Sequence, residues 1–128
     1  MKNLSPSQGD VIVYQTILTS SDISGYDIAT GTFTAPVAGV YMFTVNSCVN
    51  VNHAIAIMRN GIAIFKSTHN DARNTGSCYT TQSITPLVSG DQVLVKCDGS
   101  CRLMTDSLRW NTFSGILLRS GSSEWTLI

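Results

Sequence analysis

The sequence predicts an all-β protein whose strands pack as an antiparallel sandwich. Runs of β-branched and aromatic residues alternate with turn sequences that contain Gly, Pro, Asn-Gly or Ser-Gly, a pattern typical of such sandwiches. No segment carries the 3.6-residue apolar period of an amphipathic helix. A chain of 128 residues is long enough for one core. We therefore expect a single domain over residues 1–120 and a short tail over residues 121–128.

Eight segments are expected to be strands. The clearest local signal is Asn60-Gly61, which lies between two apolar runs. Both central residues of a type I′ hairpin turn need positive φ, and Asn-Gly accepts it. In chain order, the expected strands are residues 11–18, 32–35, 39–48, 53–59, 62–68, 77–87, 92–97 and 112–119.

Residues 26–43 are the most informative segment. Pro36 lacks an N–H donor, so it is expected at an edge or a corner rather than in a central strand. Gly39 permits a sharp bend or a close backbone approach. The residues that follow have the two-residue period of a strand, with Tyr41 and Phe43 on the same side. The segment therefore predicts an edge strand, a corner and a core strand in succession.

The composition limits the partners. Net charge is zero and only 12% of the residues are charged, so no basic surface for nucleic acid is expected. No apolar run approaches the ~20 residues of a membrane helix, and membrane insertion is not expected. The first residues also lack the apolar stretch of a secretion signal. Either the protein is cytosolic or a signal has been removed, and we favour secretion.

Catalytic chemistry is not expected. Glu124 is the chain's single glutamate and lies in the tail, so a carboxylate pair would require two aspartates brought together by folding. His53 and His69 have no nearby nucleophile motif. Ser114-Gly115 lies within an apolar strand and is interpreted as packing. We expect a protein that is not an enzyme and needs no cofactor, and calcium dependence stays open.

The spacing of aromatic residues and glycine in this region resembles the globular complement C1q domain family. That family has an aromatic residue, six residues, Phe, five residues, and then Gly-x-aromatic-x-Phe. Here Tyr26, Phe33, Gly39, Tyr41 and Phe43 stand at these positions. The likeness extends over roughly residues 11–118.

The carboxyl-terminal part agrees with the resemblance, since residues 90–95 and 113–118 look like the family's last two strands. The resemblance implies a ten-strand jelly roll like that of tumour necrosis factor, assembled as a compact homotrimer. The sheet that carries Tyr41, Phe43 and Phe113 would face the threefold axis, and these residues would form the trimer interface.

Four cysteines are present, and sequence alone permits three pairings. Disulfides are favoured over a zinc site, because the two histidines do not have finger spacing. In the topology that the resemblance implies, the end of strand 39–48 meets the start of strand 77–87, which pairs Cys48 with Cys78. Cys97 and Cys101 flank a turn sequence and are expected to close a small ring.

The implied jelly roll brings three connections together at one end, residues 46–52, 69–77 and 98–109. They contain three of the chain's five arginines. Loops on a rigid sandwich are a common place for recognition, and arginine suits the carboxylate of an acidic sugar. The expected glycan-binding residues are Arg73, Tyr79 and Arg109, followed by Asn52, Asp71, Arg102, Asp106 and Trp110.

Residues 110–115 and the additional cysteines resemble invertebrate members of the family, especially those of molluscs. Such members often act as soluble lectins in innate immunity, and some bind sialic acid. The sequence is therefore interpreted as a secreted, trimeric C1q-like lectin for glycans or glycoproteins, with acidic sugars such as sialic acid as candidates. The alternative is a protein-recognition or trimerisation module that binds a receptor or an immune complex.

Overall fold

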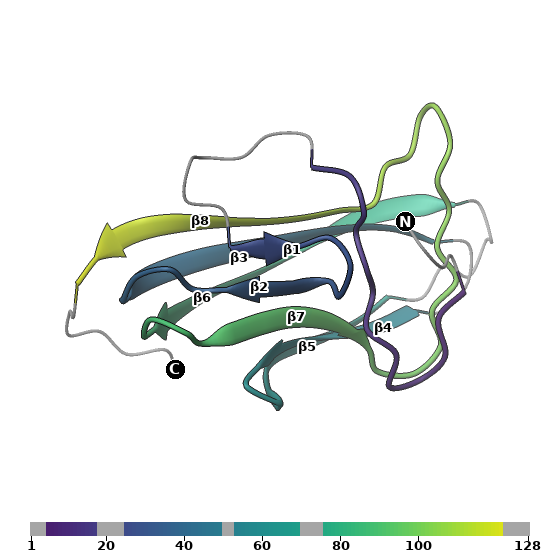
Figure 1. The fold of residues 1–128 in the computed structure, drawn as a ribbon. Coiled ribbons are helices and arrows are strands. Elements are labelled where there is room, and N and C mark those ends of the chain that lie inside the picture. Colours follow the sequence, from purple (N-terminus) through teal and green to yellow (C-terminus); the bar gives the residue numbers. More distant parts are fainter. Residues whose placement is uncertain (1–4, 18–24, 50–52, 70–75, 122–128) are drawn as a thin grey trace.

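A computed structural model describes residues 5–17, 25–49, 53–69 and 76–121 (Figure 1). In these residues the chain forms strands and no helix. Seven of the eight expected strands are confirmed to within one residue at each end. The strands are β1 (Tyr26–Asp27), β2 (Thr32–Thr34), β3 (Gly39–Val49), β4 (His53–Arg59), β5 (Ile62–His69), β6 (Ser77–Leu87), β7 (Gln92–Cys97) and β8 (Thr112–Ser120).

The strands form two antiparallel sheets that pack as layers (Figure 1). One sheet has the order β1-β2-β7-β4-β5, and the other has the order β6-β3-β8. Non-sequential neighbours such as β2 and β7 are the crossovers expected of a jelly roll. The described residues contain eight strands rather than the ten expected, but the fold class is as predicted. None of these residues belongs to a helix long and apolar enough to cross a bilayer.

The prediction of a strand over residues 11–18 was wrong. Within residues 5–17, Val11 forms an isolated bridge with Lys96, and residue 18 lies outside the described residues. The amide and carbonyl of Tyr14 are both bonded to the hydroxyl of Tyr26, at 2.9 and 2.7 Å. A side-chain hydroxyl thus takes the place of a neighbouring strand for this residue. The segment follows the sheet without becoming a regular strand.

The turn at Asn60-Gly61 has the expected backbone, with φ of 48° and 82°. The Asn60 side chain donates to Asp91 at 2.9 Å and accepts the amide of Gln92, also at 2.9 Å. Hydrogen bonds from the backbone of Val88 and from Asn60 lower the pKa of the Asp91 carboxyl. The hairpin tip is therefore tied to the turn between β6 and β7.

The core lies between the two sheets and is rich in aromatic rings. Phe43 has no exposed surface, and its ring centroid lies 5.5 Å from that of Phe33 and 5.9 Å from that of Phe113. Tyr41 is 2% exposed, and Phe113 is partly buried against the same cluster. These contacts all lie within one chain.

The assignment of Tyr41 and Phe43 to the trimer interface was therefore wrong, whereas that of Phe113, which is only partly buried, stays a prediction. Tyr41 and Phe43 are fully buried before any second chain is added, so they have no surface to offer to one. Alternate residues of a strand point to opposite faces, and the sequence reading chose the inner set. The outward set of the same sheet is the one available to another subunit.

The outer face of β6-β3-β8 is arranged in rows across the three strands. Met42 is paired with Ile84 on one side and Ile116 on the other, which makes an apolar row. Nearer the carboxyl end of β3 lies a polar row, in which Asn46 accepts from Thr80 at 2.6 Å and donates to Thr112 at 2.8 Å. The face thus changes from apolar to polar along the strands.

Gly115 is expected to be intolerant of a side chain, as its interpretation as a packing residue implies. It is paired with Phe43 across β8 and β3, and a Cβ there would approach a Phe43 ring carbon to 2.9 Å. Overpacking of this kind costs about 1–3 kcal/mol. Gly115→Ala should therefore lower the free energy of unfolding by that amount in urea denaturation. The outward neighbour provides the control, since Ser114→Ala should change it by less than about 0.5 kcal/mol; equal effects would contradict the packing.

Candidate binding site at the loop end

We use the term loop end for the end of the sandwich at which β3 and β5 finish and β4 and β6 begin, together with residues 98–111. Figure 1 shows the 98–111 connection extending beyond the sheets there. Of the predicted binding residues, Asn52, Asp71 and Arg73 lie outside the described residues. The described ones are Tyr79, Arg102, Asp106, Arg109 and Trp110.

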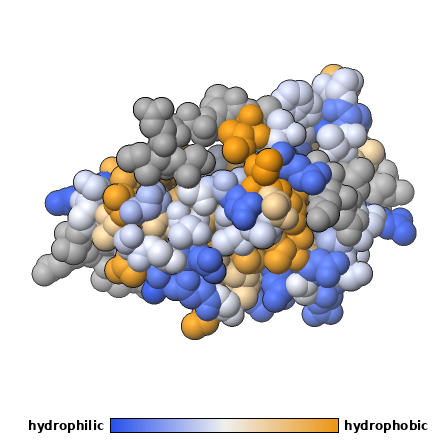
Figure 2. All heavy atoms as spheres, in the orientation of Figure 1, coloured by the Kyte–Doolittle hydropathy of each residue, from blue (hydrophilic) through white to orange (hydrophobic). Residues whose placement is uncertain are grey.

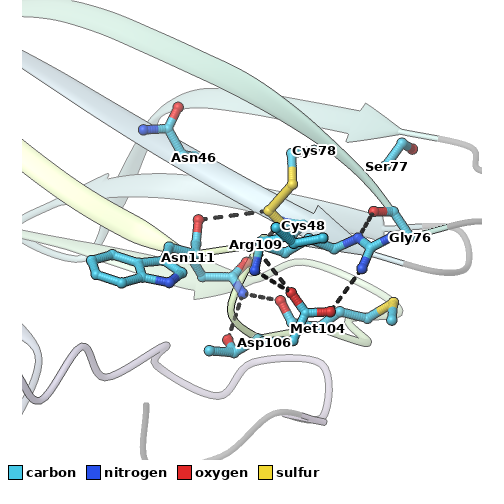
Figure 3. The surroundings of a disulfide bond; sticks show 12 residues. Asn46, Cys48, Gly76, Ser77, Cys78, Met104, Asp106, Arg109 and Asn111 are labelled. Atoms are coloured by element: carbon cyan, nitrogen blue, oxygen red, sulfur yellow. Dashed lines mark hydrogen bonds and ion pairs between the residues drawn. A yellow bond between two sulfur atoms is a disulfide. The ribbon is translucent and has the colours of Figure 1, made fainter.

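The side chain of Asn111 holds the 98–111 connection against the sheet (Figure 3). Its carbonyl oxygen accepts the amide of Cys48 at 2.7 Å, beyond the point where β8 pairs with β3. Its amide nitrogen donates to the carbonyl of Met104 at 2.7 Å and to the hydroxyl of Thr105 at 3.0 Å. One side chain therefore joins the start of β8, the end of β3 and the middle of the loop.

Asp106 and Arg109 form a second clamp (Figure 3). The Asp106 carboxylate accepts the amides of Leu108 and Arg109, both at 2.8 Å, and pairs with the Arg109 guanidinium at 2.7 Å. The hydrogen bond from Leu108, followed by those from Arg109, lowers the pKa of this carboxyl. Nε of Arg109 also donates to the carbonyl of Gly76 at 2.6 Å, just before β6. Arg109 thus connects the loop to the neighbouring strand.

The two disulfides are the pairs expected from the sequence. Cys48 and Cys78 are direct partners on β3 and β6, with their Cα atoms 4.0 Å apart. Cys97 is bonded to Cys101, with Cα atoms 6.1 Å apart, at the start of the connection. Residues 98–111 are therefore bounded by a disulfide at one end and by the Asn111 bonds at the other.

This framework exposes two large apolar side chains. Trp110 is 57% exposed and Leu108 is 87% exposed. The carbonyl oxygen of Trp110 lies 3.6 Å from Sγ of Cys48, which places its backbone beside the disulfide. Arg102 is also exposed. Among the described residues, no hydrogen bond or ion pair joins Arg102 to Arg109 or Trp110.

Tyr79 belongs to a different environment. It lies on the inner face of β6, where its ring stacks on His69 at 4.4 Å and meets His53 edge-on at 5.9 Å. Burial raises its pKa to about 12, and its buried hydroxyl has no hydrogen-bond partner among the described residues. The structure thus groups Asp106, Arg109 and Trp110 at the surface and places Tyr79 between the sheets.

Sequence reasoning missed the residues that shape this site. Asn111 was noted as part of the carboxyl-terminal motif, yet its hydrogen bonds to Cys48 and Met104 depend on the folded path of the loop. Leu108 was not predicted, because a single leucine in a polar loop does not indicate that it is exposed.

The face drawn in Figure 2 mixes hydrophilic and hydrophobic patches, in keeping with the small share of charged residues. Among the described residues, no group of three or more His, Cys, Asp or Glu side chains converges on a point.

The two-sheet topology defines a jelly roll of the class shared by C1q and tumour necrosis factor domains. It is similar to "Globular Domain of Zebrafish Complement 1qA protein", with a TM-score of 0.75 and 17% identity over 93% of this chain and 94% of that one. It is also similar to "Crystal structure of Rabbit GITRL", with a TM-score of 0.59 and 12% identity over 77% and 78% of the two chains. These likenesses establish the fold.

The sequence establishes the family. The C1q domain family matches residues 1–118, so the chain belongs to that family. It is 28% identical over 115 residues to mouse "Complement C1q tumor necrosis factor-related protein 3" and 32% identical over 124 residues to mouse "Complement C1q and tumor necrosis factor-related protein 9". These matches cover 88% and 92% of this chain but 46% and 34% of the relatives. The chain thus spans less than half the length of either relative.

Proposed function

We propose that this C1q domain is a secreted, trimeric lectin domain that binds glycans at the loop end, with acidic sugars such as sialic acid as the leading ligands. The observation that carries the proposal is the half-exposed Trp110 on a connection fixed by Asn111, Asp106 and a disulfide. Exposed apolar patches often mark a binding surface, and a sugar ring can stack on the face of an exposed aromatic side chain. A loop that is already ordered loses little entropy on binding.

In this proposal, arginine side chains recognise the carboxylate of an acidic sugar. Arg102 is exposed beside the Cys97–Cys101 disulfide, and a guanidinium suits a sugar carboxylate. Arg109 acts mainly by holding the loop in place, because its Nε and Nη1 already donate to Gly76 and Asp106. Its replacement would weaken binding by releasing the loop. Arg73 and Asp71 remain candidates from the sequence.

Trimer assembly supports the same function, because it repeats a weak site three times and raises avidity. C1q and tumour necrosis factor-like domains typically form trimers. The outer face of β6-β3-β8 offers the apolar row of Met42, Ile84 and Ile116 for contact with a second copy. Two disulfides fit an oxidising, extracellular setting.

Replacement of Trp110 tests the site. We expect Trp110→Ala to weaken glycan binding by about 2 kcal/mol, roughly thirtyfold, because a large ring at the centre of a contact carries much of its energy. Trp110→Phe keeps an aromatic face and should lose far less. The measurement is isothermal titration calorimetry with a glycan that binds the wild type. Light scattering checks that the trimer persists. Equal affinity of the wild type and Trp110→Ala would place the site elsewhere.

A protein partner is the second candidate, and Leu108 favours it. A leucine that is 87% exposed next to a tryptophan suits an apolar pocket on another protein better than it suits a sugar. A domain of this kind would bind a receptor or an immune complex. Capture of one defined protein that free sugars do not displace would select this function over the lectin.

A further inference from the structure

His53 is a buried histidine whose ring is not satisfied by the surrounding chain. It is 2% exposed, and neither Nδ1 nor Nε2 has a hydrogen-bond partner among the described residues. Buried polar atoms in native proteins almost always have a partner, and exceptions often mark a bound water or ion. Two unsatisfied nitrogens on one buried ring therefore point to a ligand that the protein chain does not supply.

His69 lies next to His53 across the strands. The two residues are directly opposite in the antiparallel pair of β4 and β5, where Cβ atoms are ~4.5–5.5 Å apart. Both face the inside of the sandwich, since the ring of Tyr79 on β6 contacts each of them. Nε2 of His69 lies 3.2 Å from the hydroxyl of Ser77. Two imidazoles thus share one end of the interior with hydroxyl groups.

The chemistry of this pair suits a metal ion. A metal ion binds neutral imidazole through the lone pair of a ring nitrogen, and both ring nitrogens of His53 lack a partner among the described residues. Zinc–nitrogen bonds are ~2.0–2.1 Å long, so one ion could bind the imidazoles of two residues that lie directly opposite each other on neighbouring strands. All four cysteines are in disulfides, so no thiolate competes for the ion.

We propose that His53 and His69 form a site for a divalent transition-metal ion of the imidazole-binding kind, with zinc as the probe. Water and nearby hydroxyl groups such as that of Ser77 would complete the coordination, because no third His, Cys, Asp or Glu joins the pair among the described residues. Imidazole ligands favour zinc, copper and nickel over calcium and magnesium. Such an ion would join β4 to β5 beneath the loop end.

The experiment uses the fact that the chain contains two histidines and no others. The protein is prepared without a polyhistidine tag, so that each imidazole gives its own nitrogen-15 NMR signal. Zinc chloride is then titrated in, with calorimetry for stoichiometry. We expect one ion per chain, movement of both imidazole signals, and reversal by a chelator. His69→Gln, at the half-buried position, should fold and bind zinc at least tenfold more weakly.

A second variant tests whether His53 binds the metal ion or only packs in the interior. His53→Gln tests the buried ring, and it too should lose zinc binding, whereas Lys66→Gln on exposed β5 should not. Three results would overturn the site: no shift of the His53 signal with zinc, a shift of the His69 signal alone, or unchanged zinc affinity in His69→Gln.

Discussion

Replacement of Ile116 by arginine is expected to convert the proposed trimer into a folded monomer. Ile116 is 49% exposed in the single chain and lies in the apolar row with Met42 and Ile84. A threefold contact through this face would bury three guanidinium groups close together, and unpaired buried charge is strongly unfavourable. Light scattering should change from about three chain masses to one, near 13.8 kDa.

Ile62→Arg is the matched control for this result. Ile62 is 71% exposed at the tip of the β4–β5 hairpin, on the other sheet, so the same change there should leave the trimer intact. Circular dichroism should report a folded β protein for both variants. If Ile116→Arg remained a trimer, the outer face of β6-β3-β8 would not be the subunit contact.

Truncation of Phe43 is expected to have the largest effect on stability. Phe43 is fully buried, and its ring packs against those of Phe33, Tyr41 and Phe113. Phe43→Ala removes that packing and leaves a cavity, which costs about 3–5 kcal/mol. Urea denaturation is the measurement. It is best made on the monomeric Ile116→Arg background, because subunit association changes apparent stability with concentration.

The neighbouring outward residue supplies the comparison. Thr44→Ala lies on the same strand but on the opposite face, and it should alter the free energy of unfolding by less than about 0.5 kcal/mol. A small effect of Phe43→Ala, or a large one of Thr44→Ala, would mean that the faces of β3 are reversed. The pair of variants therefore tests the corrected orientation of the sheet directly.

Local signals predicted most of the fold. Asn60-Gly61 specified a hairpin whose two positive φ values follow from the residue types, and Gly39 and Gly115 marked close approaches that the structure contains. The family spacing added the strand neighbours, and with them the Cys48–Cys78 pair. Each of these features depends on a few adjacent residues or on a pattern with fixed spacing.

The errors came from features that depend on the whole fold. Alternation identified Tyr41 and Phe43 as sharing a face, but period two alone does not say whether that face is inside or outside. Residues 11–18 were predicted to form a strand, yet the Tyr26 hydroxyl bonds both backbone groups of Tyr14. The same limit applies to the site: the prediction that Arg109 contacts a ligand came from the sequence, whereas its hydrogen bond to Gly76 depends on the folded path of the loop.

A glycan array with the wild-type trimer is the most direct test of the proposed lectin function. The expected result is binding to a defined set of glycans, strongest for those with acidic sugars, that free sugar displaces. The array should be read with and without a chelator, so that any dependence on calcium is seen in the same experiment. Absence of binding to every glycan, by a protein shown to be folded and trimeric, would contradict the proposal that this C1q domain is a lectin.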